Sequence, residues 1–334
     1  MKILAAILLL LFAQTAFCQD VHKIVVSVPG PRNLSYLPID LIPKIAADRD
    51  AGVKIQLLHT GGGSVALNNL VTRNADFAVA GLPAAMSLRA NNGDVFAVAA
   101  VDDAPLFVLM VRSALKDKVK RIADLKGKVI GVNTSTKNSK TTSQQLAELV
   151  LQSDGVDLDS VRIVPAGQSW VEQSSLMITG AADAVMGDEP FASRLLAKGQ
   201  VFFLANLAEP ETARKIPGAN FLHAAVLTRA DVMQDSPDKV EKMVGMLRKS
   251  LQWIATHSPE EVVDKLGVTD PDERASLLLA LNKYPRAFSK DGMFSTRQLR
   301  ETELFFRKTS AGDPRGQALV LDSMVNAKWA GRRK

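Results

Sequence analysis

A glycine-rich loop between a predicted strand and a predicted helix is the first feature of this sequence suited to holding a ligand. It reads Thr60-Gly-Gly-Gly-Ser64, and the free amides at the start of a helix carry partial positive charge. Helix starts of this kind bind anions without a basic side chain, so we predict that Gly62, Gly63 and Ser64 contact a ligand. The loop lacks the Lys-Ser/Thr ending of a phosphate P-loop. The alternative is a turn in which Ser64 is only the helix N-cap.

A second polar loop, Asn133-Thr134-Ser135-Thr136, follows another predicted strand. Its hydroxyls and amides suit an anion or an amide group, and we predict that Thr134, Ser135 and Thr136 bind the ligand. The same side chains suit capping of the helix that follows. The two roles are compatible.

The residues after the first predicted strand supply a cation and an aromatic ring. Arg32 can pair in bidentate fashion with a sulfonate or carboxylate, and Tyr36 can form an apolar wall with a polar tip. Asn33 and Ser35 lie between them, so all four are candidate ligand-binding residues. The alternative for Arg32 is a solvated side chain beside two prolines.

An apolar residue and two acids complete the candidate site. Leu82 is predicted to line it. Asp188 and Glu189 would repel an anion, so if they reach the site they favour a ligand with N–H donors, such as a pyrimidine or an amine. Glu189 is therefore included as a candidate contact. The alternative, which their position before a helix favours, is that both carboxylates complement the helix dipole.

Residues that commonly perform catalysis or hold a metal are few and poorly spaced. The four histidines form no H-x-x-x-H or H-E-x-x-H pattern. No G-x-S-x-G nucleophile motif occurs, and Cys18 is the only cysteine. We predict no catalytic residue, no metal site and no cofactor.

The N-terminus has the pattern of a secretory signal. Lys2 precedes an unbroken apolar run from Ile3 to Phe12, and small residues then lead to Cys18. Polar residues follow too soon for a membrane-spanning helix, which needs about 20 apolar residues. We predict a signal peptide over residues 1–18 and a periplasmic protein. Lipid attachment at Cys18 is the alternative.

The remaining chain is long enough for two domains and is mildly basic, with a formal net charge of +6 for the whole sequence. A nucleic-acid site gathers basic residues on one face with aromatic partners. Here the basic residues are scattered and aromatic residues make up only 5% of the chain, so no nucleic-acid partner is expected. The charge favours solubility and a mild attraction for anions.

Short apolar strands alternate with helical stretches along the chain, and this alternation places the polar loops at strand ends. The predicted strands include Lys23–Val28, Val53–Leu58, Phe77–Ala80, Lys128–Val132 and Asp183–Met186. Such alternation is typical of α/β proteins with a largely parallel sheet. In open α/β sheets, ligands bind beyond the carboxyl ends of strands. The candidate loops are therefore expected to converge.

Short motifs in chain order resemble type II periplasmic solute-binding proteins. Ile122–Val132 (IADLKGKVIGV) is similar to the opening of that family's second lobe, and Asn74–Ala78 (NADFA) resembles its G-x-x-D-F-A signature, with Asn74 in place of glycine. Thr179–Ala184, Asp188–Pro190 and Ser236–Glu261 resemble further motifs of the second lobe and of the C-terminal helices. The most similar group binds sulfonates, taurine, nitrate and thiamine-precursor pyrimidines for ABC importers.

This resemblance implies two lobes, each a mixed sheet flanked by helices, joined by a hinge with two crossings. Lobe 1 would comprise residues 19–110 and 213–334, and lobe 2 residues 111–212. The crossings would lie near residues 110–113 and 206–220, with the ligand held between the lobes.

The resemblance also implies a function. The chain is expected to act as a monomer, to capture a small, sulfonate-like anion and to deliver it to an ABC import permease without chemistry of its own. The alternatives are a ligand sensor for a membrane partner, a receptor for a pyrimidine or an amine, and a periplasmic enzyme.

Overall fold

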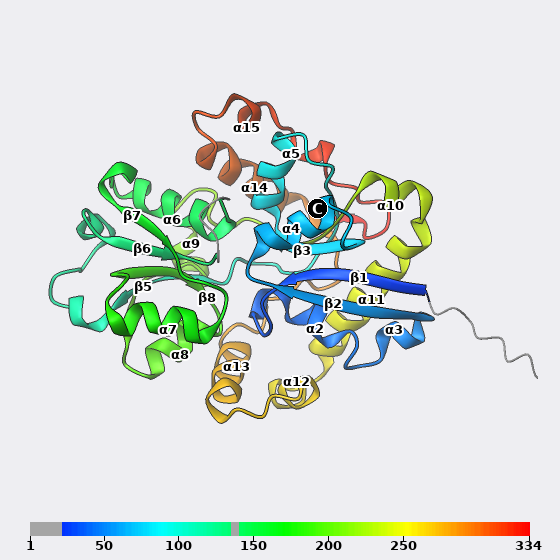
Figure 1. Cartoon of the computed structure of the whole chain (residues 1–334), viewed down its shortest axis with the longest axis horizontal. Coiled ribbons are helices and arrows are strands. Elements are labelled where there is room, and N and C mark those ends of the chain that lie inside the picture. The colour runs from blue at the N-terminus through cyan, green and yellow to red at the C-terminus, as the bar shows by residue number, and fades with distance from the viewer. Residues whose placement is uncertain (1–21, 135–139) are drawn as a thin grey trace, which may run out of the picture.

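The computed structural model describes residues 22–134 and 140–334, so the predicted signal peptide and the predicted contacts Ser135 and Thr136 lie outside the described residues. It consists of two lobes, each built on a five-stranded sheet with helices packed around it (Figure 1). The predicted two-lobed α/β fold with mixed sheets is confirmed.

The sheet of lobe 1 has the strand order β2-β1-β3-β10-β4. Its strands are β1 (His22–Pro29), β2 (Val53–Thr60), β3 (Phe77–Gly81), β4 (Phe96–Ala100) and β10 (Ala224–Thr228). β1 pairs in parallel with β2 and β3, whereas β10 runs antiparallel to β3 and β4. Ile24, Val26 and Val28 of β1 are fully buried, as β-branched residues in a covered sheet should be.

The sheet of lobe 2 has the order β7-β6-β8-β5-β9. Its strands are β5 (Phe107–Arg112), β6 (Val129–Val132), β7 (Arg162–Pro165), β8 (Ala184–Asp188) and β9 (Val201–Asn206). β6 pairs in parallel with β7 and β8, while β5 is antiparallel to both β8 and β9. Each lobe therefore contains parallel strands and at least one antiparallel strand.

Helices cover both faces of each sheet. Those of the first and second lobes are α2 (Leu37–Leu41), α3 (Ala47–Asp50), α4 (Gly63–Val71), α5 (Leu82–Ala90), α6 (Thr142–Ser153), α7 (Trp170–Thr179), α8 (Phe191–Ala197) and α9 (Pro210–Ala213). The C-terminal part adds α10 (Ala230–Asp235), α11 (Pro237–Thr256), α12 (Pro259–Leu266), α13 (Pro271–Lys283), α14 (Thr296–Thr309) and α15 (Pro314–Ala318). Short 3-10 turns and a two-stranded pair, β11 (Phe294–Ser295) with β12 (Arg332–Arg333), complete the described chain.

The first crossing between the lobes differs from the prediction. The sequence interpretation placed residues up to 110 in lobe 1, but β5 begins at Phe107 and pairs within the sheet of lobe 2. Leu109 packs in the core beneath α6, and Met110 packs in the core beneath α7 and α8, because successive strand residues face opposite sides. The crossing therefore lies between Ala100 and Phe107. An apolar strand fits either sheet equally well, so its pattern does not reveal its partner.

The return crossing lies between the end of β9 at Asn206 and the start of β10 at Ala224. Ile216 and Phe221 still pack in the core of lobe 2, so that lobe extends beyond the predicted boundary at residues 212 and 213. Leu222 is the first residue of this segment in the core of lobe 1.

The C-terminal helices contact both lobes. α11 packs against α2 and α3 of lobe 1, whereas α13 contacts α8 and α14 contacts α6 of lobe 2. An ion pair of 2.6 Å between Lys198 and Asp272 joins α8 to α13. The C-terminal part therefore braces the two lobes beside the hinge.

Phe305 of α14 stacks on Phe221, with ring centroids 4.2 Å apart, and both side chains are fully buried. The substitution Phe305→Ala should lower the free energy of unfolding by about 3–5 kcal/mol, because it removes buried apolar contact and leaves a cavity. Urea unfolding measures this loss. Leu304→Ala is the matched control, since Leu304 is 38% exposed, and a change beyond about 0.5 kcal/mol is not expected there.

Candidate functional site

A small polar cavity lies between the two lobes, at the ends of their strands. Its volume is about 20 Å³, room for about one water molecule, so the lobes are closed on each other. Lobe 1 contributes Tyr36, Gly63, Gly81, Ala84 and His223, and lobe 2 contributes Phe107, Asn133, Thr141, Thr142, Ser143, Gln168 and Asp188.

The topology of the sheets brings these residues together. Gly81 and Asp188 are the last residues of the parallel strands β3 and β8, and Asn133 directly follows β6. His223 comes immediately before β10, which runs antiparallel to β3, so its start lies beside the end of β3. The cavity thus lies beyond the carboxyl ends of the parallel strands, where α/β sheets bind ligands.

Three buried side chains of lobe 1 form a chain that ends at the cavity. The Tyr36 hydroxyl lies 3.5 Å from Nε2 of His223, and Nδ1 of His223 lies 3.3 Å from a carboxylate oxygen of Asp102. The other oxygen of Asp102 accepts the Ala224 backbone N–H at 2.9 Å. A carboxylate beside Nδ1 favours the tautomer with the proton on that nitrogen. Nε2 of His223 faces the Tyr36 hydroxyl on the cavity side.

Burial perturbs the acid groups of this chain. It raises the pKa of Asp102, and the contact with His223 opposes that shift. Burial, followed by the charge of Asp188, raises the pKa of Tyr36 well above its usual range. Tyr36 therefore keeps its proton at any physiological pH and can donate a hydrogen bond.

Asp188 is the acidic side chain that lines the cavity, and it is 2% exposed. The Asn33 amide donates a hydrogen bond to its Oδ2 atom. Burial raises the pKa of Asp188 from 3.8 to about 6, and the hydrogen bond from Asn33 opposes this rise. The Asn133 side-chain amide also opposes the rise, but within the described part of the chain the Oδ1 atom makes no hydrogen bond of good geometry. It is an acceptor suited to an N–H donor of a ligand.

Hydrogen bonds from amides and hydroxyls fix the loop at Asn133, which forms part of the cavity wall in lobe 2. Gln168 donates to the Asn133 carbonyl at 2.8 Å, and Gln173 donates to the Asn133 side-chain oxygen at 3.4 Å. Ser143 accepts the Asn133 N–H at 3.0 Å and donates to the Met186 carbonyl at 2.7 Å. Bonds in several directions fix this loop, which favours a preformed binding surface.

Glycines of lobe 1 have no side chain, so residues of lobe 2 can pack directly against the backbone of lobe 1. A Cβ atom on Gly81 would lie 2.1 Å from Oγ1 of Thr142, and one on Gly30 would lie 3.1 Å from the Gln168 carbonyl oxygen. Gly62 has a φ of 148° and also faces Gln168. Any larger side chain at Gly81 would therefore collide with lobe 2 in the closed form.

The structure brings some of the predicted residues to the cavity. Tyr36 and Gly63 line it, and Asn33 holds Asp188. Gly62 is the N-cap of α4 and packs near Thr134. Ser35 is fully buried nearby but does not line the cavity. The alternative role of Ser64 as N-cap is wrong, because the N-cap of α4 is Gly62 and Ser64 lies inside the helix.

Two other predicted contacts, Arg32 and Leu82, lie elsewhere. Arg32 has a φ of 67° and forms an ion pair of 3.2 Å with Glu273 of α13 instead of lining the cavity. Leu82 is fully buried in the core of lobe 1, and its neighbour Gly81 lines the cavity. The direction in which the Arg32 and Leu82 side chains point depends on how the neighbouring strands and helices lie in the fold. The sequence of the loop alone does not reveal it.

Glu189 also lies outside the cavity, since its carboxylate faces away from it. It accepts the backbone N–H and the hydroxyl of Ser193 at 3.0 and 2.9 Å, and the Tyr284 hydroxyl at 3.3 Å. Burial raises its pKa, and the Ser193 bonds oppose the rise. Of the two adjacent acids, Asp188 reaches the site and Glu189 supports the helix start. Glu189 thus has the alternative role that its position before a helix favoured.

Sequence reasoning missed His223, Thr142 and Gln168 as cavity residues. His223 was visible only as an isolated histidine, and its one local signal is its position immediately before an apolar strand. Thr142 is the first residue of α6, and Gln168 lies in a polar loop. Only the approach of the two lobes gives these residues a role.

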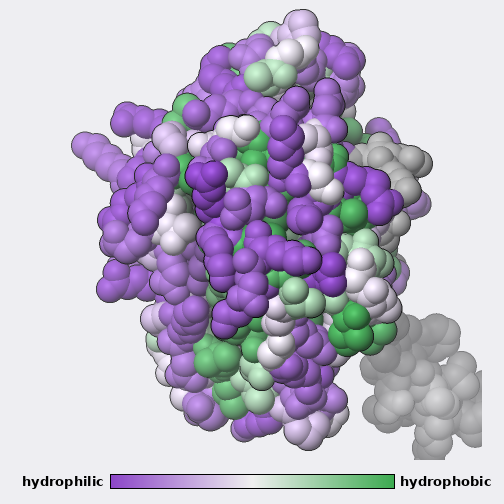
Figure 2. All heavy atoms as spheres, turned by 90° about the vertical axis from the view of Figure 1, so that its left-hand side faces the viewer, coloured by the Kyte–Doolittle hydropathy of each residue, from purple (hydrophilic) through white to green (hydrophobic). Residues whose placement is uncertain are grey.

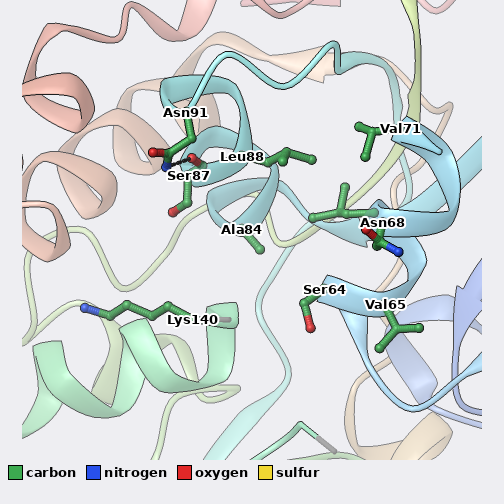
Figure 3. Close-up of a pocket in the computed structure, with 10 residues that line it drawn as sticks. Ser64, Val65, Asn68, Val71, Ala84, Ser87, Leu88, Asn91 and Lys140 are labelled. Atoms are coloured by element: carbon green, nitrogen blue, oxygen red, sulfur yellow. Dashed lines mark hydrogen bonds between the residues drawn. The ribbon is translucent and has the colours of Figure 1, made fainter. Parts of the chain in front are cut away.

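A wider hollow of about 700 Å³ adjoins the cavity at the mouth of the cleft (Figure 3). Its walls come from α4 and α5, and Lys140 faces them from the start of α6. Ser64 lines this hollow, and Ala84 lines both hollows, so the wider one is the approach to the cavity. Lys140 is ion-paired with Glu148, which compensates its charge.

Two further observations concern the described residues as a set. No group of three or more His, Cys, Asp or Glu side chains within residues 22–134 and 140–334 is placed to hold a metal ion. In the same ranges, no helix is long and apolar enough to span a membrane.

Comparison with known proteins matches residues 49–262, more than half of the chain, to the model of a family described as NMT1/THI5 like. No curated protein matches the chain. Among solved structures, a protein of Bordetella bronchiseptica RB50 has a TM-score of 0.82 at 20% identity, covering 92% of this chain and 95% of that one.

Two solved neighbours have named ligands. The alkanesulfonate-binding protein SsuA from Xanthomonas axonopodis pv. citri, bound to MOPS, has a TM-score of 0.72 at 18% identity, covering 93% of this chain and 98% of its own. The periplasmic nitrate-binding protein NrtA from Synechocystis PCC 6803 has a TM-score of 0.62 at 14% identity, covering 76% and 69%. At these identities the likeness concerns the fold.

Proposed function

Because the chain belongs to the NMT1/THI5-like family, we propose that it is a solute receptor, which captures a small organic molecule between its lobes and delivers it to an ABC import permease. The observation that carries the proposal is the enclosed polar cavity, whose walls come from both lobes. A ligand that contacts both walls binds the closed form better than the open form, and so shifts the population towards closure. The fold neighbours include binding proteins for an alkanesulfonate and for nitrate, which supports this role.

The cavity lining favours a nitrogen-bearing solute over the anion expected from the sequence. None of the described residues that line the cavity is Lys or Arg, and Asp188 is an acid. An anion beside a buried carboxylate would be repelled. By contrast, a charged Asp188 carboxylate accepts hydrogen bonds from N–H groups. We therefore propose a ligand with N–H donors, of the pyrimidine or amine type.

A small anion of the sulfonate type is the second candidate. Gly63, the first residue of α4, lines the cavity, and the helix start offers backbone N–H groups with partial positive charge. This candidate requires Asp188 to be protonated. It is therefore expected to bind better below about pH 6, where the raised pKa places the neutral form.

Delivery to a permease requires only a transient contact. The outer face of lobe 2 is mostly hydrophilic, with small separate apolar patches (Figure 2). Transient partners meet through surfaces that are less hydrophobic than those of obligate complexes. The hydrophilic face is compatible with repeated docking and release.

The test is a thermal-shift screen of ligand-stripped protein against pyrimidines, amines, sulfonates and nitrate, followed by small-angle scattering with each hit. A ligand present at about 1,000 times its dissociation constant adds about 4 kcal/mol of stability, which raises the melting temperature by several degrees. We expect hits among the N–H donors, and compaction of the protein on binding. Binding without any compaction would contradict the receptor mechanism, while hits confined to anions would overturn the proposed ligand class.

A further inference from the structure

A second pocket, of about 500 Å³, lies behind the hinge and shares no lining residue with the cleft cavity. It is enclosed by the C-terminal end of α11, by α12 and α13, and by the loop over residues 284–290. The walls are mainly apolar and include Leu251, Ile254, Val262, Leu281, Tyr284 and Phe288. Its volume is within the range of about 300–1,000 Å³ typical of small-molecule sites.

Two cations without partners lie on this pocket. Arg286 and Lys290 both line it and are exposed, and within residues 22–134 and 140–334 neither makes an ion pair or a side-chain hydrogen bond. The acid in the lining, Asp103, is already paired with Arg333 at 2.6 Å. The apolar pocket therefore has an uncompensated positive charge at its rim.

The remaining polar groups of the lining are engaged within the protein. Nδ1 of His257 contacts the Trp253 carbonyl at 2.7 Å, and the Ser289 hydroxyl accepts the Gly292 N–H at 3.1 Å. Neither group needs a ligand to satisfy it. Apolar contact with the walls and attraction to the charges of Arg286 and Lys290 would therefore both favour binding of a molecule in this pocket.

The pocket is built on the hinge. The Asp103 N–H donates to the Ala287 carbonyl at 2.9 Å, which ties the pocket loop to the first crossing. The Tyr284 hydroxyl accepts a hydrogen bond from Asn206, at the end of β9, at 3.0 Å, which ties the same loop to the second crossing. These contacts attach the pocket to both crossings between the lobes.

We propose that this pocket is a second binding site, for an amphipathic organic anion with a compact apolar body and one carboxylate or sulfonate group. The apolar body would displace water from the walls formed by α11, α12 and α13, which is favourable in proportion to the apolar area covered. The anionic group would lie at the rim, beside Arg286 and Lys290, where charge-assisted hydrogen bonds form.

The probe for this site is 8-anilinonaphthalene-1-sulfonate, a fluorescent amphipathic anion. Titration into the full mature chain should give a saturable rise in fluorescence. The double substitution Arg286→Ala and Lys290→Ala should weaken this binding by about tenfold, equivalent to the loss of one well-formed charged contact. Ala255→Trp, from an exposed position on the pocket wall, should abolish the signal by filling the space.

Three controls separate this site from the cleft and from nonspecific charge effects. Lys116→Ala with Lys118→Ala removes two exposed charges from lobe 2 and should leave the titration unchanged. Asp188→Asn, which removes the cleft carboxylate without adding an atom that opposes closure, should also leave it unchanged. Circular dichroism verifies the fold of each variant.

The proposal is overturned if the parent protein gives no saturable signal, or if the Arg286/Lys290 variant binds the probe as tightly as the parent. A changed signal in Asp188→Asn would place the probe in the cleft and would equally overturn the site. None of these outcomes affects the proposed receptor function, which is measured by closure on a cleft ligand.

Discussion

Replacing Gly81 with alanine is expected to hold the lobes apart and to weaken ligand binding by about tenfold or more, a loss of at least about 1.4 kcal/mol. The backbone of Gly81 has φ −61° and ψ 124°, which alanine adopts freely, so the variant should fold. In the closed form, however, the new Cβ would lie 2.1 Å from Oγ1 and 2.9 Å from Cβ of Thr142. That overlap opposes closure. Calorimetric titration with the ligand found by the screen measures the loss, and small-angle scattering measures the opening.

The matched control is Gly245→Ala, because a Cβ there meets nothing within 4 Å and alanine favours a helix interior. This variant should bind ligand like the parent. Adding Thr142→Gly to Gly81→Ala removes both clashing atoms and should restore closure. If Gly81→Ala binds and compacts like the parent, the lobes do not close through this contact, and the closed-cleft mechanism would need to be abandoned.

Replacing Asp188 with asparagine is expected to raise stability and abolish ligand binding at the same time. Burial raises the pKa of the folded-state carboxyl to about 6 from its ordinary value of 3.8, so the folded protein binds this proton more tightly than the unfolded chain does. Stability therefore falls as the pH rises from about 4 to about 6, and the penalty then stays constant, on the order of 3 kcal/mol. Asparagine carries no charge and avoids that penalty. Its side-chain oxygen can still accept the hydrogen bond from Asn33.

The pH dependence distinguishes this explanation from a general gain in packing. At about pH 7.5 the melting temperature of Asp188→Asn should exceed that of the parent by several degrees, and at about pH 4 the difference should vanish. For a ligand with N–H donors, affinity for the parent should increase as the pH rises through about 6, because the charged carboxylate is the better acceptor. A stability gain that persisted at low pH would contradict the assigned cause.

Glu189→Gln is the control for this prediction. It makes the same isosteric change in the adjacent buried acid, whose carboxylate binds Ser193 and Tyr284 outside the cavity. Ligand affinity should stay within a few-fold of the parent. A loss as large as that of Asp188→Asn would mean that the effect comes from the strand end as a whole and not from the cavity carboxylate.

A stabilising and inactivating substitution is a physical signature of a binding site. A buried carboxylate with a free oxygen costs stability in the empty protein, and a ligand that donates to that oxygen recovers part of the cost. The Asp188 pair with Asn33 joins the two lobes across the cleft. The same group can therefore contribute to closure and to recognition.

Local sequence patterns determined the class of the fold and the general place of the site. The alternation of apolar strands and amphipathic helices predicted an α/β protein, since burial on a sheet face or a helix face has a period that the residue order itself records. The glycines of the Thr60–Ser64 loop predicted a close approach of the backbone to a ligand, and in the structure Gly63 and Tyr36 line the cavity. Glycines and strand ends can be recognised in the sequence because the backbone requirements that select them act within a few residues.

Only the tertiary structure decided which side chains meet. β5 joined the sheet of lobe 2 because its apolar residues pack on both sides there, and an apolar strand carries no mark of its partner. Arg32 turned to Glu273, which is 241 residues away along the chain. Asp188 entered the cavity while Glu189 turned to Ser193, because one step along the backbone reverses the side-chain direction at a strand end. Pairings between distant segments depend on how the lobes pack, and that information is distributed over the whole chain rather than held in any one motif.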